Sequence, residues 1–188
     1  MTDFVHLHVH SEYSLLDGLS KVKKLVARVK ELEMSAVALT DHGVMYGIIE
    51  FYKECQSLGV KPLLGMEAYT VPVDHKRKDT KDDRVNNHLV LIVKNYTGYK
   101  NLMKITTIAH LEGFYYKHRI DLKTLKLYSE GLICLSACPK GEIGQSIIEG
   151  DFVKTKKQIA WYVDTFGEEN YFLEIQRHQY KDYFANYE

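Results

Sequence analysis

The fold is decided by the stretch Phe4-Val5-His6-Leu7-His8-Val9-His10-Ser11-Glu12-Tyr13-Ser14-Leu15-Leu16-Asp17-Gly18, in which three histidines alternate with apolar residues. Successive side chains of an extended strand point to opposite faces. We therefore predict a strand at about residues 4–9 that places His6, His8 and His10 on one face. Neutral imidazole is the commonest metal ligand in proteins. Three imidazoles followed by Asp17 predict the start of a metal site, and a strand with a solvated polar face is the alternative.

The composition sets limits on the class of protein. A chain of 188 residues is long enough for one domain with a sizeable core. Lysine plus arginine and aspartate plus glutamate number 25 each, so the formal net charge is zero. This balance argues against a protein that wraps nucleic acid by its overall charge. A local basic groove or a metal site is still compatible with it. Three cysteines do not form a disulfide framework, and no apolar run is as long as a membrane span. We expect a cytoplasmic protein without a membrane partner.

Predicted strands alternate with predicted helices along the chain. Hydrophobic periodicity predicts strands near residues 36–39, 62–69, 88–94, 131–136 and 171–175, with helices near 21–33, 46–58, 99–111, 142–149 and 151–166. Ser20 is the predicted N-cap of the first helix, and Gly59 the C′ residue of the second. Such alternation predicts parallel strands with right-handed crossovers in a barrel-like α/β domain. The charged segment 74–87 is predicted to be a solvated loop, with a nucleic-acid contact as the alternative.

Candidate ligands follow the predicted strands, where α/β proteins place their sites. They are His8, His10, Asp17, His42, Glu67 and Cys138. Singly, each could be a turn residue, an exposed carboxylate or a buried thiol. His88 begins its strand, so a parallel sheet would place it at the opposite end. Asp41 is predicted to orient a histidine ring, and His6 to line the base of the site.

More than four ligands imply more than one ion. Nitrogen, oxygen and sulfur ligands together suit zinc, manganese or iron rather than calcium. Clustered ions of this kind are typical of phosphoester hydrolysis. Cys138 acting as a nucleophile beside a histidine is the alternative chemistry.

Three motifs resemble the polymerase-and-histidinol-phosphatase (PHP) domain. They are the opening stretch to Gly18, then Thr40-Asp41-His42-Gly43, then Gly65-Met66-Glu67. Segments 87–91, 95–102, 131–138 and 170–176 are similar to the N-terminal PHP domain of bacterial replicative DNA polymerases of the polymerase III alpha family. The resemblance covers essentially the whole chain. Residues 1–188 would then be one PHP domain, incomplete at its C-terminus, in the N-terminal part of a longer polymerase.

The resemblance implies a fold, a ligand set and partners. The expected fold is a distorted seven-stranded (β/α) barrel whose last strand or strands are missing from this chain. It implies two to three divalent ions in the intact protein, held by His8, His10, Asp17, His42, Glu67, His88 and Cys138, with two more ligands from a later Asp-x-His motif. Expected partners are DNA, a sliding clamp and a separate exonuclease.

Three functions follow from the resemblance as expectations. The first is metal-dependent phosphodiester hydrolysis, acting as a 3′–5′ exonuclease in the intact protein, whose polymerase active site lies outside this chain. The second is a structural and partner-docking domain without nuclease activity. The third is a stand-alone PHP phosphatase. Arg119, in an aromatic and basic loop, is predicted to contact phosphate.

Overall fold

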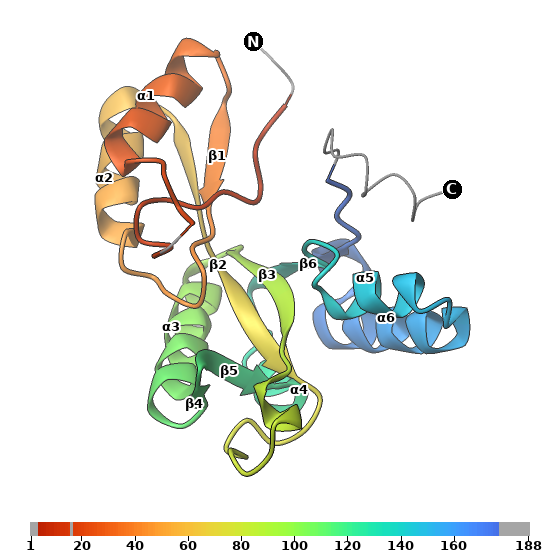
Figure 1. Ribbon diagram of the computed structural model, residues 1–188. Coiled ribbons are helices and arrows are strands. Elements are labelled where there is room, and N and C mark those ends of the chain that lie inside the picture. The colour runs from red at the N-terminus through yellow and green to blue at the C-terminus, as the bar shows by residue number, and fades with distance from the viewer. Residues whose placement is uncertain (1–3, 16, 177–188) are drawn as a thin grey trace.

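A computed structural model describes residues 4–15 and 17–176, and the chain forms a mixed α/β fold (Figure 1). The strands form one sheet and are β1 (Ala36–Leu39), β2 (Lys61–Val71), β3 (Asn87–Val93), β4 (Phe114–Tyr115), β5 (Lys117–Asp121), β6 (Leu132–Leu135) and β7 (Tyr171–Phe172). The helices are α1 (Val22–Glu31), α2 (Ile48–Leu58), α3 (Tyr96–Leu111), α4 (Leu122–Leu127), α5 (Glu142–Ile148) and α6 (Phe152–Phe166). Of the residues described, none belongs to a helix that is long and apolar enough to cross a membrane.

The sheet is mixed, so the prediction of uniformly parallel strands was wrong. Its order is β4-β5-β2-β3-β6-β7, and β1 also pairs with β2. β2 is parallel to β1 and β5, but β3 is antiparallel to both β2 and β6. The connection from β2 to β3 is a loop with one short 3-10 turn, which lets the chain return beside β2 in the opposite direction. Within the described part of the chain no ladder joins β1 to β7, so the sheet is open there.

The histidine-rich stretch is extended but is not the predicted strand. It makes two isolated bridges, between His6 and Val37 and between Ser11 and Ser20. Further along, the Val9 amide donates to the Thr40 hydroxyl at 2.9 Å, and the Thr40 amide donates to the Val9 carbonyl at 2.9 Å. The Thr40 hydroxyl thus accepts a hydrogen bond that a main-chain carbonyl would accept in a regular pair of strands. The pairing of this stretch with β1 is therefore confined to a few residues.

The structure contradicts the predicted start of α1 and confirms the predicted end of α2. Lys21, not Ser20, is the N-cap residue of α1, and it makes no side-chain cap bond. Gly59 ends α2 with a left-handed φ of 66°, as predicted, because glycine enters that region without steric cost.

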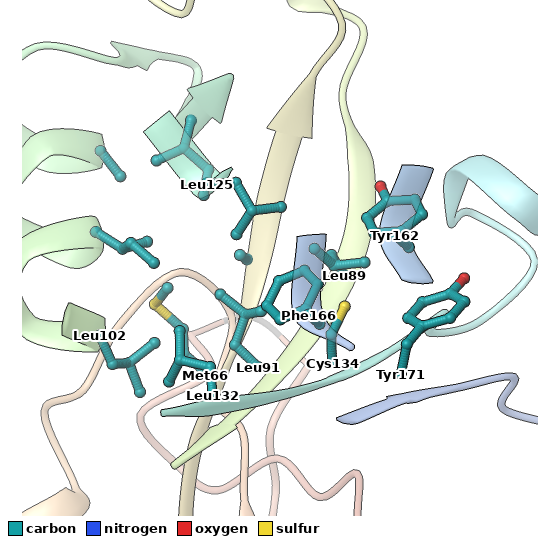
Figure 2. Close-up of a cluster of buried hydrophobic side chains, with 14 of the residues drawn as sticks. Met66, Leu89, Leu91, Leu102, Leu125, Leu132, Cys134, Tyr162, Phe166 and Tyr171 are labelled. Atoms are coloured by element: carbon teal, nitrogen blue, oxygen red, sulfur yellow. The ribbon is translucent and has the colours of Figure 1, made fainter. Parts of the chain in front are cut away.

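Helices cover the sheet in three groups. α1 and α2 lie beside β1, α3 lies along β5, and α5 with α6 lies beside β6 (Figure 1). The largest core cluster joins α3 and α6 across the central strands (Figure 2), with Met66, Leu89, Leu91, Leu102, Leu125, Leu132, Cys134, Tyr162, Phe166 and Tyr171 among its buried side chains.

Candidate metal centre

Four histidine rings surround one buried carboxylate. Glu67 is 1% exposed. Its Oε2 atom lies 3.2 Å from His8 Nε2 and 3.0 Å from His10 Nε2. The same oxygen lies 2.9 Å from His42 Nδ1, and Oε1 contacts His88 Nδ1. The five residues come from four separate parts of the chain, so only the folded protein assembles them.

Strand direction explains why His88 belongs to this cluster. β3 runs antiparallel to β2, and His88 lies opposite Tyr69, two residues after Glu67. His42 bridges directly to Glu67 after β1 ends. The start of β3 therefore lies at the same end of the sheet as the ends of β1 and β2. A parallel topology had placed His88 at the opposite end.

The two remaining predicted ligands lie at the edge of the cluster. Asp17 Oδ2 is 3.1 Å from His42 Nε2, and Cys138 Sγ is 3.7 Å from His88 Nδ1. Asp17 is exposed, whereas Cys138 is partly buried. The structure thus brings all seven predicted ligands into one connected group.

Glu174 is a member of the site that sequence reasoning missed. His8 Nδ1 donates to Glu174 Oε1 at 2.8 Å, which leaves His8 Nε2 directed at Glu67. A carboxylate that fixes one ring nitrogen so that the other faces an ion is usual for metal-ligating histidines. The predicted strand reached Ile175, but β7 ends at Phe172. Glu174 therefore follows the carboxyl end of a strand, which was the available signal.

Asp41 supports the site through a serine rather than through a histidine ring. Buried Asp41 accepts from the Ser11 amide at 2.6 Å, the Ser11 hydroxyl at 2.7 Å and the Ser14 hydroxyl at 2.7 Å. The Ser14 oxygen in turn lies 3.2 Å from His10 Nδ1. Because Ser14 gives its proton to Asp41, it accepts from His10 Nδ1–H, and the other ring nitrogen of His10, Nε2, is the one that faces Glu67. Asp41 reaches the ring of His10 through Ser14, and its role in orienting a histidine ring stays a prediction.

The charges of the cluster depend strongly on each other. Burial lowers the pKa of His8, but hydrogen bonds to Glu174 and Glu67 outweigh it and raise that pKa to about 10. Burial also lowers the pKa of His88, but Cys138 and Glu67 raise it to about 9. Burial raises the pKa of Glu67, but the histidines hold it well below its usual range. Divalent cations bound here would supply the positive charge that these protons carry, so metal binding would release protons.

The donor atoms are suitable for divalent cations. Bonds of about 2 Å to a tetrahedral ion separate its ligand atoms by roughly 3.3 Å, close to the distances from Glu67 Oε2 to His8 and His10. Glu67 Oε1 and His42 Nδ1 are buried, and their close contacts with His88 and Glu67 lack hydrogen-bond geometry. Two ligand groups share Glu67, one with His8 and His10 and one with His42 and His88.

A cavity of about 400 Å³ opens beside the ligands. It is lined by Asp17, His42, Tyr69, Val85, Asn86, Asn87, His88, Lys117, Lys140 and Gln145. The ligand cluster is therefore accessible from this side of the sheet.

Two predicted site residues lie elsewhere. His6 is exposed and its ring contacts Phe4, 4.9 Å between centroids, so it does not line the base of the site. Arg119 is 1% exposed, and its guanidinium donates to the main-chain carbonyls of Gly113, His75, Arg77 and Asp83. Four of its five N–H donors are used by these carbonyls and the side chain is buried, so the prediction that Arg119 contacts phosphate was wrong.

Comparisons with known proteins agree with the geometry. The chain is 48% identical over 180 residues to the DNA polymerase III subunit alpha of Borreliella burgdorferi, which covers 95% of this chain and 16% of that protein. It is 45% identical to the subunit of the same name from Aquifex aeolicus, covering 93% of this chain and 15% of the relative. The chain therefore spans about one seventh of the length of these relatives.

The chain also resembles known proteins in its fold and in its family motifs. An amidohydrolase from Chromobacterium violaceum shares the fold with a TM-score of 0.51 at 15% identity, over 81% of this chain and 73% of that one. The model of the PHP domain matches residues 6–178. With the ligand cluster assembled and nearly the whole length matched, the chain belongs to the PHP domain family.

Proposed function

We propose that this chain is the PHP domain of a bacterial replicative DNA polymerase and that, in the intact protein, it hydrolyses phosphodiester bonds at DNA 3′ ends. The observation that carries the proposal is the ring of four histidines around the buried carboxylate of Glu67. Similarity to polymerase III alpha subunits supports the polymerase assignment over a stand-alone phosphatase. The same similarity supports DNA, a sliding clamp and a separate exonuclease as partners, and a cytoplasmic location.

The proposed ligands of two to three ions of zinc, manganese or iron are His8, His10, Asp17, His42, Glu67, His88 and Cys138. When bound, such ions supply Lewis acidity at the scissile phosphate and activate water near neutral pH. The chain itself holds the ligands in place. Glu174 fixes the ring of His8, and Ser14 fixes the ring of His10. We also propose that the domain is a distorted seven-stranded barrel. Residues 1–188 would form one domain of it, which later strands of the longer polymerase would close.

The test is digestion of a mismatched primer by the intact protein. A labelled primer ending in a mispair is incubated with the natural protein and with a His8→Ala plus His10→Ala double variant. We expect the double variant to lose the 3′–5′ digestion. His6→Ala is the matched control, because His6 lies in the same stretch and outside the ligand cluster. Equal digestion by all three proteins would refute the proposal.

A structural role for the metal is the second candidate. The cluster ties the N-terminal stretch, the ends of β1 and β2, the start of β3 and the segment after β7 into one unit. A bound ion would therefore stabilise the fold even without hydrolysis. Chelation that lowers the melting temperature, in a protein that never digests the primer, would favour this second role.

A further inference from the structure

The cavity beside the ligand cluster has a cationic wall. Lys117 and Lys140 both line it, and both are exposed. In the described part of the chain the lysines that form ion pairs are Lys76, Lys126 and Lys154, so neither cavity lysine is neutralised by a carboxylate. The cavity is also lined by the carboxylate of Asp17, a proposed metal ligand, and by the neutral amides of Asn86, Asn87 and Gln145. Such a wall attracts an anion toward the ligand cluster.

Contacts hold one of these ammonium groups close to the ligands. Lys117 Nζ lies 5.0 Å from the centroid of the Tyr69 ring and donates to its hydroxyl at 3.4 Å. The Tyr69 ring lies parallel to the ring of His42, 6.0 Å between centroids, and edge-on to His88 at 5.2 Å. Lys117 is thus one aromatic ring away from two proposed ligands. A phosphate beside the scissile one would meet this ammonium.

An exposed aromatic residue directly precedes one of the cavity lysines in the chain. Tyr116 is 62% exposed and is the single residue between β4 and β5. Its φ of 60° lies in the left-handed region, which is unfavourable for a tyrosine. The Arg84 guanidinium lies 4.4 Å from the centroid of its ring. Tyr116 directly precedes Lys117, and Arg84 directly precedes Val85, so both residues adjoin the lining of the cavity.

We propose that this edge of the site binds the end of a single nucleic-acid strand. Lys117 and Lys140 hold its phosphates, and the ring of Tyr116, braced by Arg84, stacks on one of its bases. Aromatic stacking beside a basic groove is the usual way to hold single strands without reading sequence. A cavity of about 400 Å³ is near the lower limit of ligand sites, so it admits one nucleotide unit rather than a duplex end. The inference rests on the proposed function, since it names the form of substrate that this site receives.

The test is photo-crosslinking, which does not require hydrolysis. The intact protein is mixed, in chelator, with a single-stranded oligonucleotide that carries 5-iodouracil at its 3′ end, and is then irradiated. Adducts are mapped by mass spectrometry after digestion, which separates this site from the polymerase site. We expect an adduct on Tyr116, and a severalfold lower yield with the same strand in a blunt duplex.

Variants connect the adduct to the proposed contacts. Tyr116→Asn removes the ring and is expected to abolish this adduct, while asparagine tolerates positive φ and preserves the turn. Lys117→Gln with Lys140→Gln is expected to raise the oligonucleotide concentration for half-maximal yield about tenfold. The matched control is Tyr96→Ala, which removes another exposed ring with a lysine over it and is expected to change nothing.

The outcomes separate this inference from the proposed function. An adduct on Tyr116 in a protein that never digests primers supports the binding edge and refutes the exonuclease. Digestion that depends on His8 and His10, without an adduct on Tyr116, overturns the binding edge and leaves the exonuclease standing. An unchanged half-maximal concentration in the double lysine variant also overturns it.

Discussion

Replacing Arg119 by glutamine is expected to release the charged loop of residues 74–86 from the body of the domain. Arg119 Nε donates to the Gly113 carbonyl at 3.1 Å, and Nη2 donates to the carbonyls of His75 and Arg77, both at 2.9 Å. Nη1 donates to the carbonyl of Asp83. Three of these four acceptors belong to the loop, so one buried side chain holds it at three points. Glutamine can replace one of the bonds.

The expected cost follows from the bonds that glutamine cannot make. Each bond from a charged donor contributes about 1.5–3 kcal/mol, so three lost bonds give an upper limit near 5–9 kcal/mol. Two effects reduce this value. Burial lowers the pKa of Arg119, which means that the native cation bears a desolvation cost that glutamine avoids. The loop carbonyls also regain water when the loop opens. We therefore expect local stability to fall by about 3 kcal/mol.

Trypsin measures this opening directly, because the loop carries five cleavage sites, Lys76, Arg77, Lys78, Lys81 and Arg84. When opening is fast relative to cleavage, about 3 kcal/mol corresponds to a rise of roughly 100-fold in the cleavage rate. Arg28→Gln is the control, since its 2.9 Å contact with Glu31 is exposed and contributes less than about 1 kcal/mol. Equal cleavage of the loop in the two variants would refute the reasoning.

Gly98→Ala is expected to destabilise the domain by about 3 kcal/mol or more, because a Cβ atom there would lie 1.8 Å from the Gly131 carbonyl oxygen; an unchanged melting temperature would contradict this. Burial and neighbouring His110 lower the pKa of His118 to about 4. The unfolded chain therefore binds a proton at His118 that the folded chain excludes between about pH 6.5 and 4, so the free energy of unfolding falls as the pH drops through that window. Between about pH 7.5 and about pH 5, the free energy of unfolding in urea should fall less for His118→Asn than for the natural protein. An equal fall would exclude His118 as a cause of the pH dependence. Asp41→Asn should weaken metal affinity about 10- to 100-fold in a metal titration, since it disturbs the serine that positions His10; unaltered affinity would remove Asp41 from the support of the site.

The ligands could be predicted because their chemistry is local in the sequence. His8 and His10 are separated by one residue, and His42 lies in the polar turn that directly follows the apolar run 36–39. Metal ligands lie at strand ends in α/β domains, so the positions of Glu67 and Cys138 relative to apolar runs were informative. The structure brings these residues together, and their ligand role stays a prediction.

Other features depend on long-range contacts that no local pattern encodes. The direction of β3 is set by its pairing with β2 and β6, and helical periodicity elsewhere wrongly favoured a parallel strand. That direction is what brings His88 to the site. Arg119 resembles a phosphate ligand in sequence, and only the folded loop shows that most of its donors are already used. The predicted strand ran to Ile175, three residues beyond the end of β7, so Glu174 was assigned to a strand interior and its role was not recognised.

Metal content gives the most direct test of the proposed site. The intact protein is purified, incubated with excess Mn²⁺ or Zn²⁺, freed of unbound metal and analysed by mass spectrometry alongside Glu67→Gln. Circular dichroism checks that the variant is folded. We expect about two or more ions per natural chain and almost none in folded Glu67→Gln, because that carboxylate is shared by both ligand groups. A natural protein without bound metal, or a Glu67→Gln variant with the full metal content, would contradict the proposed site.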